Sequence, residues 1–350
     1  MTAALDRAFA FTQECLGRFG YVSRNDLHVR AVRAAVVTPR SFGPDRGYTG
    51  AAYDGVGALI PESLRFNQGD INPVDPPELP AGMREAAGSP RRLGIYAGSL
   101  FPILGHFVFE TLARLWPLAH LHGGGGTEPA DIVVHEWPGL ELPAFFDNTL
   151  YRALFDTLGI TPDRLVLADF PLSYETLLVA DPASRYHADM NMQMDDLLMF
   201  MRRSLLGTDA PPLTGDRLYL SRSRWGSNRR VVNEAEVDQV MAARGYKVVH
   251  PEALPPTELA GFLAGASIVV SFDGSHAHLA AFCEPETATV LFDTRPVPTQ
   301  IAIAKLRGFR IMHVPLFEMP ELYREDAGVL DPSGLCSMAE QAIRERLIAA

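Results

Sequence analysis

Two alternating patterns of apolar residues run through residues 217–292. Short runs of Leu, Val and Ile predict buried strands at 218–220, 246–249, 268–270 and 289–292. The stretches between them carry apolar residues three and four positions apart, which predicts helices between Asn233 and Gly245, near 257–266 and, in shorter form, at 276–282. Alternating strands and helices predict a doubly wound parallel sheet, and such sheets bind ligands at the carboxyl ends of their strands.

The first half of the chain shows a looser pattern of the same kind. It predicts helices near 105–120 and 145–158, a turn at 123–126, and strands at 132–134 and near Leu165 and Leu178. A methionine-rich helix over 190–206 is interpreted as core filler. We therefore expect another α/β domain in this half.

Breaker residues mark the border between the two halves. Residues 207–216 contain Gly, Pro, Thr and Asp without periodicity, which predicts a linker. The expected domains are 1–206 and 217–330, and a helix within 331–350 is expected to pack back on the first of them. Asn233, followed by Glu236, predicts a capping box at the start of the first helix of the second domain.

The composition narrows the classes of partner. The chain has 350 residues with 42 acidic and 31 basic side chains, a net charge of -11 that disfavours nucleic acid. Its three cysteines are scattered, so neither a disulfide framework nor a zinc site is expected. Because no apolar run approaches the roughly 18 residues of a membrane span, we expect a cytoplasmic protein without a transmembrane segment. Peripheral contact with a membrane is left open.

Several motifs of common enzymes are missing from the chain. It contains no Gly-x-Ser-x-Gly, no Gly-x-x-x-x-Gly-Lys, no Gly-x-Gly-x-x-Gly after a strand and no His-Glu-x-x-His. Common hydrolase, kinase and dehydrogenase schemes are therefore disfavoured.

A basic loop follows the strand expected at 218–220. Residues 221–230 hold four arginines together with serine and asparagine, and include Ser221, Arg222, Arg229 and Arg230. Guanidinium groups bind phosphate oxygens in pairs, and the loop occupies the edge at which parallel sheets bind ligands. The loop therefore predicts contact with a diphosphate. The alternative is a solvated loop whose arginines pair with nearby acids.

A second turn, Asp273-Gly274-Ser275, joins an expected strand to the helix that begins at His276. A glycine lets the backbone approach a ligand closely, and free N–H groups at a helix start can face an anion. We expect these four residues to contact the ligand. Metal binding by Asp273, His276 and His278 is disfavoured because helix positions two apart do not share a face. No metal ion or cofactor is expected.

His106 and Glu110 stand one helical turn apart in the helix expected near 105–120. A histidine beside a carboxylate can act as a general base with an orienting partner. The alternative is a surface pair without a catalytic role.

Three segments carry a resemblance to glycosyltransferase family 61. Residues 105–116 are similar to its first motif, Asn-x-Gly-His-Phe followed by Glu-Thr-Leu-x-Arg-Leu-Trp. Residues 266–282 occupy the place of its Gly-x-His-Gly-Ala-Gly-Leu-x-Asn loop. Its second motif is resembled by Tyr219 to Arg222, by Arg229 and Arg230, and by Asn233 and Glu234.

The resemblance implies a GT-B fold, in which two Rossmann-like α/β domains face a central cleft that holds the donor. It implies an inverting transfer from a nucleotide sugar, such as a UDP-sugar, to a glycan acceptor, in the synthesis of a bacterial capsule or a related polysaccharide. His106 or Glu110, in the acceptor-side domain, would take the proton of the attacking hydroxyl. The donor would be bound in the second domain by Ser221, Arg222, Arg229, Arg230, Asn233, Glu234, Asp273, Gly274, Ser275 and His276.

The chain departs from the family pattern at a few positions. Asp273 stands where the family often has His, Leu279 where it has Asn, and Ile103 where the first motif has Asn. A relative that binds a nucleotide or a sugar without catalysis therefore stays an alternative. A phosphate-ester hydrolase built on the arginine loop is disfavoured because no nucleophile is evident.

Overall fold

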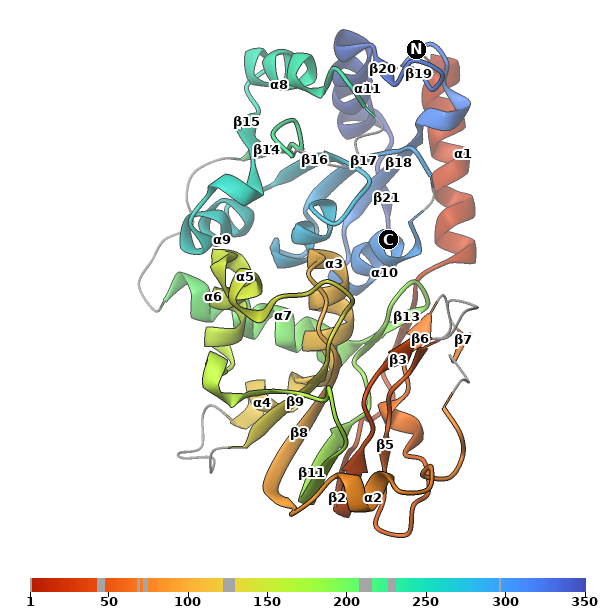
Figure 1. Cartoon of the computed structure of the whole chain (residues 1–350). Helices are drawn as coiled ribbons and strands as arrows, with labels where there is room; N and C mark the ends of the chain where they lie inside the picture. The colour runs from red at the N-terminus through yellow and green to blue at the C-terminus, as the bar shows by residue number, and fades with distance from the viewer. Residues whose placement is uncertain are drawn as a thin grey trace. The chain divides into compact units, whose positions relative to one another are not determined.

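The computed structural model describes residues 2–42, 48–67, 70–71, 75–121, 130–207, 216–225, 231–295 and 297–350. The chain divides into an N-terminal unit, Ser23–Met201, and a C-terminal unit that combines Met1–Val22 with Arg202–Ala350. Each unit is a mixed α/β structure around a sheet in which parallel pairs predominate (Figure 1). Among the helices that the structure describes, none is both long enough and apolar enough to cross a bilayer.

The sheet of the C-terminal unit has the order β15-β14-β16-β17-β18-β21. All neighbours pair in parallel except β18 and β21, which are antiparallel. The strands are β14 (Arg217–Leu220), β15 (Lys247–Val249), β16 (Ile268–Phe272), β17 (Ala288–Asp293), β18 (Arg310–Pro315) and β21 (Ile348–Ala349). The alternation of strands and helices expected over 217–292 is confirmed, and the sheet continues beyond it with β18 and β21.

Helices cover this sheet and enclose the core of the C-terminal unit. Phe272, Val290 and Met312 are fully buried in one cluster with Val237 and Leu335. The helices are α1 (Thr2–Arg18), α8 (Glu234–Ala243), α9 (Pro256–Ala264), α10 (Pro298–Arg307) and α11 (Pro332–Glu345). Shorter elements are the 3₁₀ turns η5 (Pro251–Ala253), η6 (Ala277–Phe282) and η7 (Leu316–Glu318) and the hairpin of β19 (Tyr323–Arg324) with β20 (Val329–Leu330). The short helix expected at 276–282 is thus a 3₁₀ helix.

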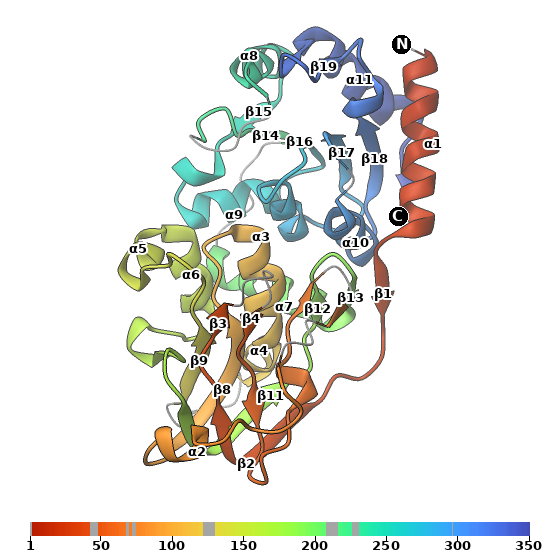
Figure 2. The same cartoon turned by 45° about the vertical axis from the view of Figure 1, so that its right-hand side comes forward.

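The two ends of the chain lie in the C-terminal unit, which differs from the expected domains. Helix α1 packs along β18, as Figures 1 and 2 both show, although residues 1–206 were expected in the first domain. The hydroxyl of Thr12 accepts the main-chain N–H of His313 at 2.8 Å, and Lys305 donates to the carbonyl of Phe19 at 2.7 Å. Helix α11 packs on α8 and α1 of its own unit, so the prediction that it returns to the first domain is wrong.

The sheet of the N-terminal unit has the order β10-β9-β8-β11-β2-β5. Its first four strands pair in parallel, whereas β2 and β5 are antiparallel additions at one edge. The strands are β2 (Val29–Val37), β5 (Ala52–Tyr53), β8 (Arg91–Ser99), β9 (Asp131–His135), β10 (Leu165–Leu167) and β11 (Leu172–Ala180). Short pairs are formed by β3 (Ser41–Phe42) with β4 (Tyr48–Thr49) and by β6 (Phe66–Asn67) with β7 (Asp70–Ile71). A three-stranded sheet has the order β1-β13-β12 and consists of β1 (Tyr21–Ser23), β13 (Asp189–Asn191) and β12 (Ser184–Arg185).

The helices of this unit are more broken than their apolar pattern predicts. The helix expected near 105–120 consists of α3 (Leu104–His106), a π-helix η2 (Phe107–Thr111), a 3₁₀ turn η3 (Leu112–Arg114) and α4 (Trp116–Leu121). The helix expected at 145–158 is interrupted at Asn148, whose side chain caps α6. The remaining helices are α2 (Met83–Ala86), α5 (Leu142–Asp147), α6 (Thr149–Thr157) and α7 (Met192–Leu206), with 3₁₀ turns η1 (Pro61–Ser63) and η4 (Pro162–Arg164). The turn expected at 123–126 lies outside the described residues, as does most of the expected linker.

The contact between Thr12 and His313 gives a test of where α1 packs. In Thr12→Val the N–H of His313 loses its acceptor inside the protein, so we expect the free energy of unfolding of the C-terminal unit to fall by about 1–3 kcal/mol. Thr12→Ser keeps the hydroxyl and is the control, for which we expect a smaller loss. Urea titration of the three proteins measures the difference. Equal stability of the Val variant and the parent would show that α1 does not pack on β18.

Candidate functional site

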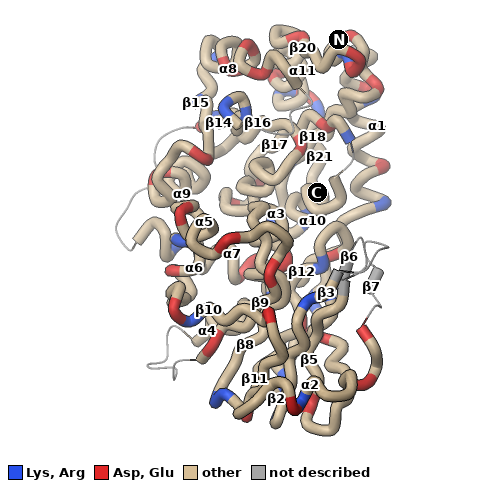
Figure 3. The backbone as a smooth tube through the Cα atoms, in the orientation of Figure 1, with Lys and Arg blue, Asp and Glu red and all other residues tan. Residues whose placement is uncertain are grey.

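The first group of candidate residues lies at the carboxyl edge of the parallel sheet in the C-terminal unit. Leu220 of β14 is paired with Ser271 of β16, so Ser221 and Asp273 follow neighbouring strands at one edge of the sheet. Doubly wound sheets bind ligands at this edge. Figure 3 shows basic residues in blue beside the end of β14.

Arg222 and Gly274 lie against each other at this edge. The φ angle of Gly274 is +138°, and a Cβ atom added to it would lie 3.0 Å from Nη1 of Arg222 and 3.2 Å from Nδ1 of His276. Such a contact is tighter than nearly all real Cβ contacts, so the close approach depends on a residue without a side chain. The structure therefore brings the basic loop and the Gly274 turn together.

A buried carboxylate holds the start of the basic loop. Glu234 is 1% exposed, and its Oε1 accepts the main-chain N–H of Arg222 at 2.8 Å and the hydroxyl of Tyr219 at 3.4 Å. Nε of Arg222 is buried and has no hydrogen-bond partner among the described residues, whereas Arg224 is exposed. Arg222 is therefore partly buried beside the Gly274 turn, and its contact with a ligand stays a prediction. Arg229 and Arg230 lie outside the described residues.

His276 adds a neutral ring to this group. Its side chain is buried, and neither ring nitrogen has a hydrogen-bond partner in the part of the chain that the structure describes. Burial, reinforced by the positive charge of Arg222 and by His278, holds the pKa of His276 well below its usual value. The imidazole is therefore uncharged at neutral pH, with one donor and one acceptor nitrogen.

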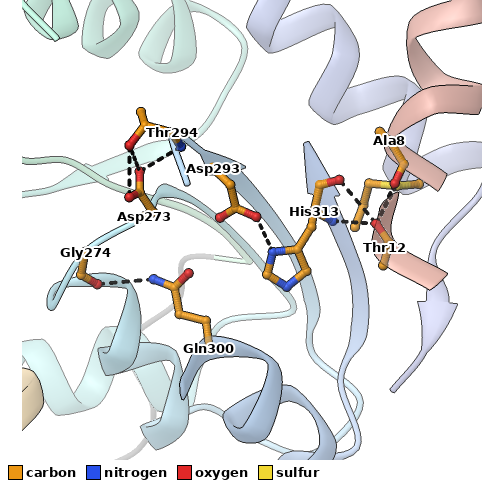
Figure 4. Close-up of polar contacts among 9 residues, drawn as sticks. Ala8, Thr12, Asp273, Gly274, Asp293, Thr294, Gln300 and His313 are labelled. Carbon is orange, nitrogen blue, oxygen red and sulfur yellow. Dashed lines mark hydrogen bonds and ion pairs between the residues drawn. The ribbon is translucent and has the colours of Figure 1, made fainter. Parts of the chain in front are cut away.

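Asp273, Ser221 and Ser275 make contacts within the sheet edge. The carboxylate of Asp273 accepts the N–H of Thr294 at 3.1 Å and its hydroxyl at 2.9 Å (Figure 4). The hydroxyl of Ser221 accepts the N–H of Ser223 at 3.0 Å, and the carbonyl of Ser275 accepts the N–H of His278 at 3.2 Å. Asp273 therefore ties the end of β16 to the end of β17. Its predicted contact with a ligand, like that of the two serines, stays a prediction.

A metal site at this turn was already disfavoured by the sequence. In the described ranges, no group of three or more His, Cys, Asp or Glu side chains is arranged to hold a metal ion, and this includes Asp273 with His276 and His278.

Asn233 does not form the capping box that the sequence predicts. Its side-chain oxygen accepts the N–H of Leu330 at 2.9 Å and its amide donates to the carbonyl of Leu330 at 3.1 Å. No side-chain hydrogen bond caps α8. The side-chain amide of Asn233 is thus bonded to the distant Leu330, and the adjacent Glu234 is bonded to the main chain of the basic loop. The amide of Asn233 also donates to Oε2 of Glu236 at 3.2 Å, so of the two residues only Glu234 holds the loop in the structure.

A buried pair on the next strands was missed by sequence reasoning. Asp293, at the end of β17, is 0% exposed, and its Oδ2 lies 2.5 Å from Nδ1 of His313 on β18. Burial raises the pKa of Asp293 to about 6, although His313 acts in the opposite direction. Figure 4 shows this pair near Gln300, whose amide donates to the carbonyl of Gly274 at 3.3 Å. An aspartate at the end of an apolar strand was the only signal in the sequence.

The second group of candidate residues belongs to the N-terminal unit and is built on the π-helix. Nδ1 of His106 lies 2.5 Å from Oε1 of Glu110, so the two residues do form the pair that their spacing predicts. π-helical turns are rare and occur frequently at functional sites. The ring centroids of Phe101 and Tyr186 lie 5.0 and 4.2 Å from the ring centroid of His106. These two rings fix the orientation of the imidazole.

Arg65 is the third member of this group and binds the carboxylate of Glu110. Its guanidinium donates to both oxygens of Glu110, at 2.6 and 3.0 Å. Burial raises the pKa of Glu110, but the hydrogen bonds from His106 and Arg65 outweigh burial and leave the pKa below its usual value. Glu110 is therefore an ionised acceptor that keeps the proton of His106 on Nδ1, which leaves Nε2 to accept another proton. Arg65 lies in a loop that no motif marks, so sequence reasoning missed it.

Comparison with known proteins decides the class of this chain. The family model described as Glycosyltransferase 61 matches residues 104–290, more than half of the 350 residues. The chain belongs to glycosyltransferase family 61. No curated protein matches it. The resemblance seen in the sequence is confirmed, and the chain is a glycosyltransferase, which acts on a sugar donor and an acceptor.

The matched range of family 61 runs from the start of α3 into β17. It contains His106 and Glu110 in one unit and Arg222, Gly274 and His276 in the other. Arg65 lies before the matched range, and Asp293 and His313 lie after it. The groups that the structure adds to the candidate site are thus the ones that the family model does not cover.

Proposed function

We propose that this chain is an inverting glycosyltransferase that moves a sugar from a nucleotide diphosphate sugar, a UDP-sugar, to a glycan acceptor. The observation that carries the proposal is the contact of Arg222 with Gly274 and His276 at the carboxyl edge of a parallel sheet. An arginine, a bare stretch of backbone and a neutral histidine at this edge suit a diphosphate.

The leaving diphosphate sets the main chemical demand of the transfer. When the bond between the anomeric carbon and the diphosphate oxygen breaks, that oxygen takes the electron pair and the negative charge. The guanidinium of Arg222 neutralises this charge, and His276 donates a hydrogen bond. The close approach at Gly274 lets the backbone contact the phosphates without a side chain between them. We assign Arg229 and Arg230 the same role from the sequence alone.

The attacking hydroxyl of the acceptor must lose a proton as its oxygen bonds to the anomeric carbon. We assign this proton to Nε2 of His106, because Nδ1 is held by Glu110. Glu110 acts as a positioning residue, since it orients the imidazole. This division of roles narrows the sequence-based hypothesis, in which either residue could be the base.

Two mixed α/β units in one chain support a GT-B fold as part of this proposal. The pathway that we propose is the synthesis of a surface polysaccharide or glycoconjugate. The cytoplasmic location stays a prediction from the sequence.

A second function is favoured by one contact. The carboxylate of Asp273, which stands where the family often has His, is bonded to Thr294. The loop could thus be retained for binding alone, in a relative that binds a nucleotide or sugar without transferring it. Such a protein would bind UDP but release none from any UDP-sugar.

The role of Arg222 is tested by comparison with Arg224 in the same loop. Because Arg222→Ala removes a charged hydrogen bond to the diphosphate, we expect the Kd for UDP to rise about 10- to 100-fold and turnover to fall. Arg224 is exposed, so Arg224→Ala should leave both within about twofold. Calorimetric titration and a UDP-release assay measure the two effects. Equal losses in both variants, or none, would contradict the assignment.

The role of His106 is tested by separating turnover from donor binding. His106→Asn removes the proton acceptor, so we expect turnover to fall at least about 100-fold while the Kd for UDP stays unchanged. Glu110→Gln keeps an acceptor oxygen beside Nδ1 and should lose less. His120→Asn, on α4 in the same unit, is the control. A His106→Asn enzyme that transfers sugar at the parent rate would show that another group takes the proton.

A further inference from the structure

A pocket lies within the N-terminal unit. Its walls come from the segment before β3, the loop after η1, the end of β8, the π-helix and β12. Among its described lining residues, four are arginines and one is a carboxylate: Arg40, Arg65, Arg114, Arg185 and Glu110. Figure 3 shows basic residues in blue near β3 and β12. The lining is therefore strongly positive.

The most buried of these arginines is held by neutral groups. Arg114 is 6% exposed, and its terminal nitrogens donate to the carbonyls of Glu62 and Leu64. Burial lowers the pKa of its guanidinium. Gly98, with a φ of +72°, makes room for it, because a Cβ atom there would lie 2.9 Å from Nε of Arg114. The chain thus keeps a cation beneath the pocket with carbonyl oxygens as its hydrogen-bond partners.

Two other arginines are placed by the walls of the pocket. Arg40 donates to the hydroxyl of Ser99 and to the carbonyl of Glu136, at 3.2 Å for the latter. Arg185, on β12, pairs with Asp189 and keeps 42% of its side chain exposed. An arginine at each side of the pocket can turn a fork of N–H groups toward a bound oxyanion.

A buried hydroxyl in the same lining also indicates a polar ligand. Ser184 is 3% exposed and lines the pocket beside Arg185. Its Oγ has no hydrogen-bond partner among the described residues. Buried hydroxyl groups in folded proteins nearly always have a partner, so this one is placed to donate to a ligand that fills the pocket.

The pocket adjoins the pair to which we assign proton transfer. Glu110 lines it and holds Nδ1 of His106. Tyr186 also lines it, and its ring lies 4.2 Å from the ring of His106. A ligand in the pocket would therefore sit next to the proposed base, which is where the acceptor is needed. Arg40, Arg65 and Gly98 precede the range matched by the family model, so they belong to a part of the chain that the family model does not describe.

We propose that this pocket binds a phosphate group carried by the acceptor sugar. A dianionic phosphate matches an excess of guanidinium groups better than a neutral sugar does, and its oxygens suit their forked donors. The role as acceptor rests on the proposed transfer reaction, whereas the binding of a sugar phosphate does not.

Calorimetric titration of the full chain with glucose 6-phosphate tests the proposal, with glucose and UDP as companion ligands. We expect glucose 6-phosphate to bind and glucose not to bind. In Arg185→Gln we expect the Kd for glucose 6-phosphate to rise about tenfold or more, through loss of a charged hydrogen bond, and the Kd for UDP to stay unchanged. Arg40→Gln should act in the same direction.

Arg91→Gln is the matched control. Arg91 is a similarly exposed arginine of the same unit, it pairs with Asp131, and it does not line the pocket. We expect its variant to bind glucose 6-phosphate within twofold of the parent. Absence of binding to the parent, or equal weakening by Arg185→Gln and Arg91→Gln, would overturn the proposal. Weakened UDP binding in Arg185→Gln would also overturn it, because the pocket would then serve the donor.

The outcome separates this proposal from the proposed function. None of these titrations requires sugar transfer. If the chain releases UDP from a UDP-sugar in the presence of a glycan acceptor but does not bind glucose 6-phosphate, the pocket proposal alone fails. If glucose 6-phosphate binds as expected and no UDP-sugar yields UDP, the pocket stands and the transfer reaction fails.

Discussion

The close approach of Arg222 to the backbone of Gly274 is the contact on which this account of the donor site depends. It exists because two strands of a parallel sheet end at the same edge and because residue 274 has no side chain to separate the loops that follow. It places a guanidinium, exposed backbone and a neutral imidazole together. A diphosphate needs such a combination, since it carries charge and many acceptor oxygens but no donors.

Buried carboxylates organise both groups of candidate residues. Glu234 fixes the main chain of Arg222, and Glu110 fixes the side chains of His106 and Arg65. In each case an acid with little solvent exposure accepts hydrogen bonds from a residue to which we assign a role in binding or transfer. Holding these groups in one geometry before the ligand arrives reduces the reorganisation that binding and transfer require.

The sequence predicts those parts of the structure that local patterns determine. The strands and helices over 217–292 follow from apolar periodicity, and the pair of His106 with Glu110 follows from a spacing of four residues. Contacts between distant segments could not be predicted. Arg65 and Arg40 come from loops without a motif, and the side-chain oxygen of Asn233 accepts from Leu330 instead of capping the main chain of its own helix. The apolar pattern of a helix such as α1 indicates that the helix covers a hydrophobic core, but it does not indicate which of the two cores. The π-helix at Phe107–Thr111 depends on tertiary contacts such as the hydrogen bond from Thr111 to the carbonyl of Ser99.

The most direct test of the donor site is the affinity of Gly274→Ala for UDP, measured by calorimetric titration. Gly245→Ala is the matched control, because Gly245 also has a positive φ but open space where a Cβ would lie. Both variants place alanine at a positive φ, +138° at residue 274 and +84° at residue 245, and only the first would push the alanine methyl group against Arg222 and His276. We expect the Kd for UDP to rise about tenfold or more in Gly274→Ala, as for the loss of a charged hydrogen bond, and to change little in Gly245→Ala. An unchanged affinity in a folded Gly274→Ala protein would contradict it.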